Sequence, residues 1–126
     1  LHPFDVKTAF LNGEVKEKIY MMQPDGFQHQ GNEDKVYKLK RSLYGLKQSS
    51  RLWYLKFHQA ILEMGYVVSP IDHCVYIWKN DDKLAILSLY VDDILLAGNC
   101  PDINIKTKNF LASRFEMKDR VLQPMF

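Results

Sequence analysis

Two adjacent carboxylates, Asp92 and Asp93, are the residues of this sequence best placed to do chemistry, because they stand between two apolar runs. Residues 84–91 and 94–98 are rich in Leu, Ile and Val, and each run has the length of a mostly buried β-strand. The gap between them leaves room only for a tight turn, which predicts a hairpin with both carboxylates at its tip. A turn breaks the alternation of side chains along a strand, so both carboxylates can face one site.

Two carboxylates about 4 Å apart repel each other, and burial strengthens the repulsion. A divalent cation relieves it, and ligands that are all oxygen favour Mg²⁺ or Mn²⁺ over zinc. The alternative is that Asp92 and Asp93 only form a polar turn, since Asp is favoured in turns for its backbone hydrogen bonds. The hairpin by itself favours this second interpretation, and the rest of the chain has to decide.

A third carboxylate, Asp5, stands near the N-terminus where a short apolar segment gives way to a turn. A two-metal site needs carboxylates from separate segments, so that two ions can be held about 3.5–4 Å apart. Asp5 can supply the second segment if its strand lies beside the hairpin. Taken alone, Asp5 is a single acidic residue at a strand end.

Length and composition indicate one domain with a substantial core. The chain has 126 residues, of which 47% are hydrophobic and 25% are charged, and its net charge is +2. So small a charge does not establish a nucleic-acid partner. The two cysteines show no metal-binding spacing, which fits a reduced intracellular setting, and no apolar run has the length of a membrane span.

Two helices are expected to position the acids. Apolar residues at three- and four-residue spacing predict a helix over residues 49–64, which Gly65 ends as a cap, and its apolar stripe is interpreted as core packing. A second helix is predicted over residues 102–115, capped by Asp102 or Asn104. The side chains expected on its inner side are Ile105, Phe110, Leu111 and Phe115.

The strands are expected to form one antiparallel sheet. Three runs over residues 74–97 predict a meander, and residues 19–22 and 36–39 predict a hairpin. Residues 1–6 are interpreted as a strand end, and residues 116–120 as a charged segment. The fold class is therefore α+β, an antiparallel sheet with helices packed on one face.

Six segments carry more distinctive sequences: residues 5–13 (DVKTAFLNG), 19–27 (IYMMQPDGF), 42–54 (SLYGLKQSSRLWY), 72–76 (DHCVY), 90–93 (YVDD) and 115–119 (FEMKD). In this order and at these spacings they resemble the catalytic motifs of copia-type retrotransposon reverse transcriptases. The YVDD tetrapeptide alone has little specificity, whereas the whole set is distributed over residues 5–119, nearly the full length of the chain.

The resemblance implies an RNA-directed DNA polymerase that transfers a nucleotide to a primer 3′-hydroxyl with two Mg²⁺ or Mn²⁺ ions. Asp5, Asp92 and Asp93 would be the catalytic and metal-binding carboxylates. Phe10 would lie beneath the sugar of the incoming nucleotide and leave no space for a 2′-hydroxyl. Without the resemblance, Phe10 is a core aromatic.

Further roles come from the same resemblance. Tyr44, Gly45 and Lys47 would bind the nucleotide, with the glycine allowing close approach and the lysine meeting phosphate. Tyr90 would pack near the primer terminus. Lys118 would be a general acid that protonates pyrophosphate. The structural alternatives are a strand aromatic for Tyr90 and an exposed helix-start lysine for Lys47.

The chain departs from the family pattern at three places. Ser50 stands where proline is usual, Pro3 and Phe4 precede Asp5 in place of the usual pair, and residues 120–126 do not continue the pattern. The expectation is a palm fragment over residues 1–126, incomplete because fingers, thumb and ribonuclease H domain are absent.

The expected partners are an RNA or DNA template-primer, deoxynucleoside triphosphates and the rest of a Pol polyprotein, without a membrane. The expected location is intracellular, in a cytoplasmic virus-like particle if the element is intact. The main alternative function is a degenerate or repurposed fragment without catalysis. A small module that stacks bases on exposed sheet aromatics is a third possibility, disfavoured because the strands are predicted to be buried.

Overall fold

The computed structural model describes residues 1–44 and 46–119, with Asp119 described by its backbone alone. A six-stranded sheet has the order β4-β5-β6-β7-β1-β8, and every neighbouring pair in it is antiparallel. Its strands are β1 (His2–Val6), β4 (Val67–Val68), β5 (Val75–Asn80), β6 (Lys83–Tyr90), β7 (Asp93–Gly98) and β8 (Met117–Asp119).

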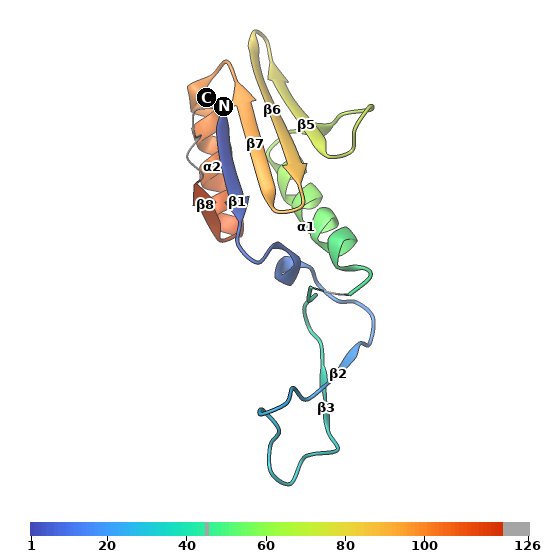
Figure 1. The fold of residues 1–126 in the computed structure, drawn as a ribbon. Coiled ribbons are helices and arrows are strands. Elements are labelled where there is room, and N and C mark those ends of the chain that lie inside the picture. The colour runs from blue at the N-terminus through green and yellow to red at the C-terminus, as the bar shows by residue number, and fades with distance from the viewer. Residues whose placement is uncertain (45, 120–126) are drawn as a thin grey trace, which may run out of the picture.

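The other elements are a 3₁₀ turn, two helices and a small hairpin. The turn η1 spans Ala9–Asn12, helix α1 spans Ser49–Glu63, and helix α2 spans Pro101–Arg114. Strands β2 (Tyr20–Met22) and β3 (Val36–Lys38) pair as the predicted hairpin. They form a second, two-stranded sheet, where one sheet was expected, and this hairpin extends away from the large sheet (Figure 1). The predicted α+β fold class is confirmed.

Both helices cover the same face of the large sheet (Figure 1). Alternate residues of β6 and β7 are buried beneath them, including Leu87, Leu89, Ile94 and Leu96, while their neighbours are more accessible. This period of two is what a sheet with one covered face requires. The opposite face is open, and it is the face on which the candidate site lies.

Helix α1 agrees closely with its prediction. Trp53, Phe57 and Ile61 of its apolar stripe are fully or almost fully buried. Gly65 follows the helix with φ +88°, a left-handed conformation that glycine adopts without strain. The interpretation of the stripe as core packing is confirmed.

Helix α2 differs from its prediction in its cap and its inner face. It begins at Pro101, with Cys100 in the capping position and no side-chain cap. Asp102 lies in the first turn and Asn104 is buried inside the helix, so neither is the predicted cap. Ile105 is 59% exposed, because the buried positions are Ile103, Asn104, Thr107 and Leu111. Leu111 and Phe115 are buried and Phe110 packs against the core, so the predicted inner side is wrong at Ile105 alone.

The two chain ends contribute more strand than the sequence indicated. Residues 2–6 form the full strand β1, which lies between β7 and β8 in the interior of the sheet. Residues 117–119 of the segment interpreted only as charged form β8 and pair with β1. Residues 120–126, which were expected to depart from the family pattern, lie outside the described residues.

Two further findings concern the described part of the chain. It contains no helix with the length and apolar character needed to cross a membrane. Cys74 and Cys100 are free thiols.

Candidate active site

Four side chains from four neighbouring strands form one row across the sheet. Tyr90 of β6 lies opposite Asp93 of β7, and Asp93 lies opposite Asp5 of β1. Asp5 in turn lies opposite Lys118 of β8. Residues directly opposite in antiparallel strands point to the same face, with Cβ atoms about 4.5–5.5 Å apart. The row occupies the open face, at the end of the sheet where β6 turns into β7 (Figure 1).

The turn between β6 and β7 contains only Val91 and Asp92, because Tyr90 already pairs with Asp93. The expectation that both carboxylates lie at the tip therefore holds for Asp92 alone, and Asp93 is the first residue of β7. The backbone N–H of Val6 donates to the carbonyl oxygen of Asp92 at 2.8 Å. This bond ties the turn to the strand that carries Asp5.

The carboxylates are partly withdrawn from solvent. The Oδ1 atoms of Asp5 and Asp93 are buried, and the Asp92 side chain is half-buried. Carboxylate oxygens are the ligands that Mg²⁺ and Mn²⁺ prefer, so the donor types fit these ions. Over residues 1–44 and 46–119, no three Asp, Glu, His or Cys side chains are grouped closely enough to hold a metal ion. The assignment of all three carboxylates as metal ligands stays a prediction.

The turn is strained, and it is held by a contact that sequence reasoning missed. Val91 has φ +56°, a left-handed conformation that β-branched residues rarely adopt. Its carbonyl oxygen accepts a hydrogen bond of 2.5 Å from Nε1 of Trp53 on helix α1. The sequence placed Trp53 in an apolar stripe, and nothing in the spacing indicated that its N–H reaches the hairpin.

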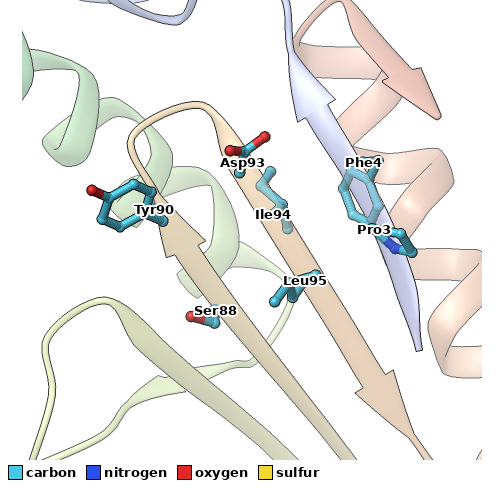
Figure 2. Close-up of a pocket in the computed structure, with 7 residues that line it drawn as sticks. All are labelled: Pro3, Phe4, Ser88, Tyr90, Asp93, Ile94 and Leu95. Carbon is cyan, nitrogen blue, oxygen red and sulfur yellow. The ribbon is translucent and has the colours of Figure 1, made fainter. Parts of the chain in front are cut away.

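A shallow hollow of about 300 Å³ opens on the same face beside Asp93. Figure 2 shows that its walls come from β1, β6 and β7, with Tyr90 and Asp93 at the turn end and Pro3 on the neighbouring strand. Ser88 and Leu95 continue it along the hairpin. The hollow is largely apolar, with the Asp93 carboxylate and two hydroxyl groups as its polar side chains, and Tyr90 is 76% exposed at its rim.

The predicted nucleotide-binding residues fall into two groups. The rings of Phe10 and Tyr44 contact each other, with centroids 4.6 Å apart and planes tilted by 31°. Phe10 also packs against the core, whereas Tyr44 is exposed. Lys47 is exposed in the segment before α1. Gly45 lies outside the described residues.

Polar contacts fix the segments that carry these two rings. The N–H of Ser42 donates to the carbonyl oxygen of Gly13 at 2.9 Å. The Ser42 hydroxyl donates to that of Ser49 at 2.7 Å, and Ser49 donates to the carbonyl oxygen of Leu43. Gly13 lies directly on α1, where a Cβ would come within 2.9 Å of the Cβ of Leu52. The contact between Phe10 and Tyr44 is thus supported by the backbones on both sides.

The structure therefore brings Asp5, Asp93, Tyr90 and Lys118 into one row, with Asp92 on the adjoining turn. Phe10 and Tyr44 form a second pair, on the loops after β1 and before α1. The chemical roles assigned to these residues remain predictions.

The chain matches the family model for reverse transcriptase (RNA-dependent DNA polymerase) over residues 1–125. The match includes residues 120–125, so the expectation that the family pattern stops after residue 119 is not supported. It is 46% identical over 116 residues to the Retrovirus-related Pol polyprotein from transposon TNT 1-94 of Nicotiana tabacum. The aligned region is 91% of this chain and 9% of that protein. No solved structure matches the chain.

Two other relatives show the same relationship. The Retrovirus-related Pol polyprotein from transposon RE1 of Arabidopsis thaliana is 37% identical over 119 residues, covering 94% of this chain and 8% of that protein. The putative transposon Ty5-1 protein YCL074W of Saccharomyces cerevisiae is 36% identical over 115 residues, and the aligned region is 91% of this chain and 37% of that protein. The chain thus spans less than a tenth of the two plant polyproteins. Because the family model matches nearly every residue and the relatives are transposon proteins, this chain belongs to the reverse transcriptase family of copia-type retrotransposons.

Proposed function

We propose that this chain forms the catalytic palm of an RNA-directed DNA polymerase, which adds deoxynucleotides to a primer 3′-hydroxyl. The observation that carries the proposal is the in-register row of Tyr90, Asp93, Asp5 and Lys118 on the open face of the sheet. The carboxylates of Asp5 and Asp93 lie opposite each other, and Asp92 in the adjoining turn carries a third. Such a group of carboxylates suits the binding of divalent cations beside a phosphate chain.

Asp5, Asp92 and Asp93 would hold two Mg²⁺ or Mn²⁺ ions. The chemistry supplied by these ions, when bound, is activation of the primer hydroxyl and neutralisation of charge on the triphosphate and the departing pyrophosphate. The protein's own contribution is to hold the three carboxylates in fixed positions. The pairing of β1 with β7 fixes the Asp5 and Asp93 side chains on one face, and the Val6 N–H holds the Asp92 backbone beside them.

The surrounding side chains would select and orient the substrates. Phe10, braced by Tyr44, would contact the sugar of the incoming nucleotide and exclude a 2′-hydroxyl. Lys47 would contribute a point charge for phosphate. Tyr90, exposed at the rim of the hollow, would contact the primer terminus. Lys118, opposite Asp5, would donate a proton to pyrophosphate.

The whole enzyme requires more than this chain. The relatives are Pol polyproteins, and residues 1–126 would act as their palm together with fingers and thumb supplied by the rest of the polyprotein. Grip on a template-primer depends on many phosphate contacts by basic residues. The net charge of +2 indicates that most of those contacts come from elsewhere in the polyprotein.

The test replaces the matching 116-residue segment of the TNT 1-94 polyprotein with this chain and measures primer extension on a ribonucleotide template with Mg²⁺ or Mn²⁺. We expect extension by the chimera, and loss to background in Asp92→Asn. Asp82→Asn is the matched control, because this exposed carboxylate lies at the opposite turn of β6. Its activity is expected to equal that of the unsubstituted chimera.

The isolated chain is assayed in parallel, over a range of protein concentrations. An active chimera with an inactive isolated chain supports a competent site that needs the rest of the polyprotein. An inactive chimera that still folds contradicts the proposal and favours the alternative, a degenerate or repurposed fragment without catalysis.

A further inference from the structure

We propose that Trp53 is a positioning residue of this site, and that its indole N–H holds the Val91–Asp92 turn in the conformation that aligns the carboxylates. This inference rests on the proposed function for its consequence in catalysis. Its structural part, that the turn geometry depends on the Trp53 hydrogen bond, is tested without any catalytic assay.

The contact joins two elements that are far apart in the sequence. Trp53 lies in the first half of α1 and Val91 at the tip of the β6–β7 hairpin, 38 residues later. The Nε1 atom donates to the Val91 carbonyl oxygen at 2.5 Å. The tryptophan side chain has a single polar atom, Nε1, which can only donate a hydrogen bond. Here that atom donates to the turn.

The acceptor belongs to a strained residue. In the described part of the chain three non-glycine residues have positive φ, and two of them, Val91 and Thr8, are β-branched. Conformations of this kind persist when the surrounding structure over-determines them, and they cluster at functional sites. Without an external partner, a two-residue turn built from Val and Asp has other conformations open to it, in which the Asp92 side chain would point elsewhere.

The second peptide group of the turn is also held. The Val6 N–H donates to the Asp92 carbonyl oxygen at 2.8 Å. Two consecutive carbonyl groups are therefore fixed from two directions, one by helix α1 and one by strand β1. Fixing both groups sets the backbone on each side of the Asp92 Cα, and so sets the direction of its side chain relative to Asp5 and Asp93.

The donor itself is buried and closely packed. Trp53 is 2% exposed, and its ring lies edge-on to Phe115 with centroids 5.1 Å apart and planes at 80°. Phe57 packs against it with centroids 5.8 Å apart, and Phe57 and Phe115 also contact each other. Phe115 lies two residues before β8, the strand that carries Lys118. The same buried indole therefore contacts both the β6–β7 turn and the residue that leads into β8.

The competing interpretation is that Trp53 only fills volume in the core. The two interpretations differ in what happens when the N–H is removed and the ring is kept. Replacing Trp53 by 3-benzothienylalanine, in which sulfur takes the place of the N–H, preserves the size of the ring and removes the donor. Trp53→Phe removes the donor with some loss of volume. Trp78→Phe is the matched control, because Trp78 lies opposite Ala85, far along the sheet from the turn.

The experiment measures amide hydrogen exchange by NMR in the 126-residue chain, together with the urea midpoint of each variant. We expect exchange at residues 90–93 to accelerate at least tenfold in Trp53→Phe and in the benzothienyl variant. Exchange in β5 and the urea midpoint of the benzothienyl variant should stay at the level of the unsubstituted chain, and Trp78→Phe should leave exchange at residues 90–93 unchanged. Unchanged exchange at the turn in the benzothienyl variant would overturn the inference.

A second measurement separates this inference from the proposed function. Mn²⁺ is titrated into each variant, and its affinity is measured by paramagnetic broadening of resonances near Asp5. We expect at least a fivefold weaker affinity in the benzothienyl variant and no change in Trp78→Phe. Absence of Mn²⁺ binding by the unsubstituted chain would contradict the proposed function, whereas the exchange comparison would still decide the role of Trp53.

Discussion

Asp5 and Asp93 are the residues whose placement says most about this molecule. Like charges directly opposite each other on neighbouring strands destabilise a sheet, and a cation bound between them has the opposite effect. The structure nevertheless aligns these two carboxylates and buries one oxygen of each. Such an arrangement is expected where a site has been built for a ligand and not for stability alone.

Divalent cations are therefore expected to stabilise the folded chain through this site. A ligand present at ten times its dissociation constant contributes about 1.4 kcal/mol to the free energy of unfolding. We expect Mn²⁺ to raise the thermal midpoint of the unsubstituted chain, and Asp5→Asn to remove the increase. Asp82→Asn, at the distant turn, serves as the control and should retain it. An equal increase in Asp5→Asn would place the bound ion elsewhere.

The ring of Phe10 yields a prediction about substrate choice. Its contact with Tyr44 holds the side chain in one orientation, and truncation to Phe10→Ala would open space beside the sugar. In the chimeric polymerase we expect discrimination against ribonucleotides to fall at least tenfold, about 1.4 kcal/mol in relative transition-state energy. The ratio of kcat/KM for the two nucleotide classes measures it. An unchanged ratio would return Phe10 to the role of a core aromatic.

At the residue scale, sequence reasoning found the carboxylates but could not place them. The apolar runs around Asp92 and Asp93 predicted the hairpin, because strand length and composition are local properties. The pairing of Asp5 with Asp93 depends on which strand lies beside which, and no local pattern encodes that. The hydrogen bond from Trp53 to Val91 was missed for a related reason, since the direction of an N–H in a core residue depends on the packing around it.

The elements show the same division between local and long-range information. Helix α1 and Gly65 were predicted because apolar spacing and a glycine cap are read within one segment. The inner face of α2 was predicted incorrectly at Ile105, since that helix also buries Asn104 and Thr107. The Thr107 hydroxyl is hydrogen-bonded to Tyr66 at 2.8 Å, a partner that makes burial of a polar side chain tolerable. Strand β8 was missed because it is short and charged.

The junction between η1 and α1 is an element contact that leaves no room for an added side chain. A Cβ on Gly13 would approach the Leu52 Cβ to 2.9 Å and the Ser42 Cβ to 3.3 Å. We expect Gly13→Ala to lower the free energy of unfolding by about 1–3 kcal/mol, because overpacking forces the backbone to shift. Ser50→Ala, at an exposed position in the first turn of α1, is the control and should change stability by less than about 0.5 kcal/mol. Urea unfolding measures both, and equal midpoints for the two variants would contradict this account of the junction.

Across the whole molecule, one face of the sheet forms the core and the other carries the candidate site. The covered face forms the core with α1 and α2, and it includes the buried hydroxyls of Tyr66 and Tyr76. The open face carries the row of site residues and exposed apolar side chains such as Ile86 and Leu95. Stability and proposed function are therefore placed on opposite sides of the same strands.

This division leads to a prediction about alkaline pH. Burial raises the pKa of Tyr66 and of Tyr76 above the unfolded value of about 10. Below pH 10 both hydroxyls are neutral in both states, so their contribution is fully present. As pH rises further, the unfolded chain ionises first, and stability falls by about 1.4 kcal/mol per pH unit for each such tyrosine.

We expect urea midpoints to stay level from pH 7 to 9 and to fall above pH 10. Tyr76→Phe should make that fall shallower, because one of the two buried hydroxyls is removed. Tyr20→Phe is the control, since Tyr20 is exposed on the β2–β3 hairpin, and its variant should keep the original slope. An unchanged slope in Tyr76→Phe would show that its burial does not govern the alkaline limit.

The most direct test of the central claim is anomalous diffraction from crystals of this chain soaked in Mn²⁺. The account predicts manganese on the open face of the sheet, bound by carboxylate oxygens of Asp5, Asp92 and Asp93, and lost in crystals of Asp5→Asn. Manganese bound only away from these three carboxylates, or peaks that persist unchanged in Asp5→Asn, would contradict it.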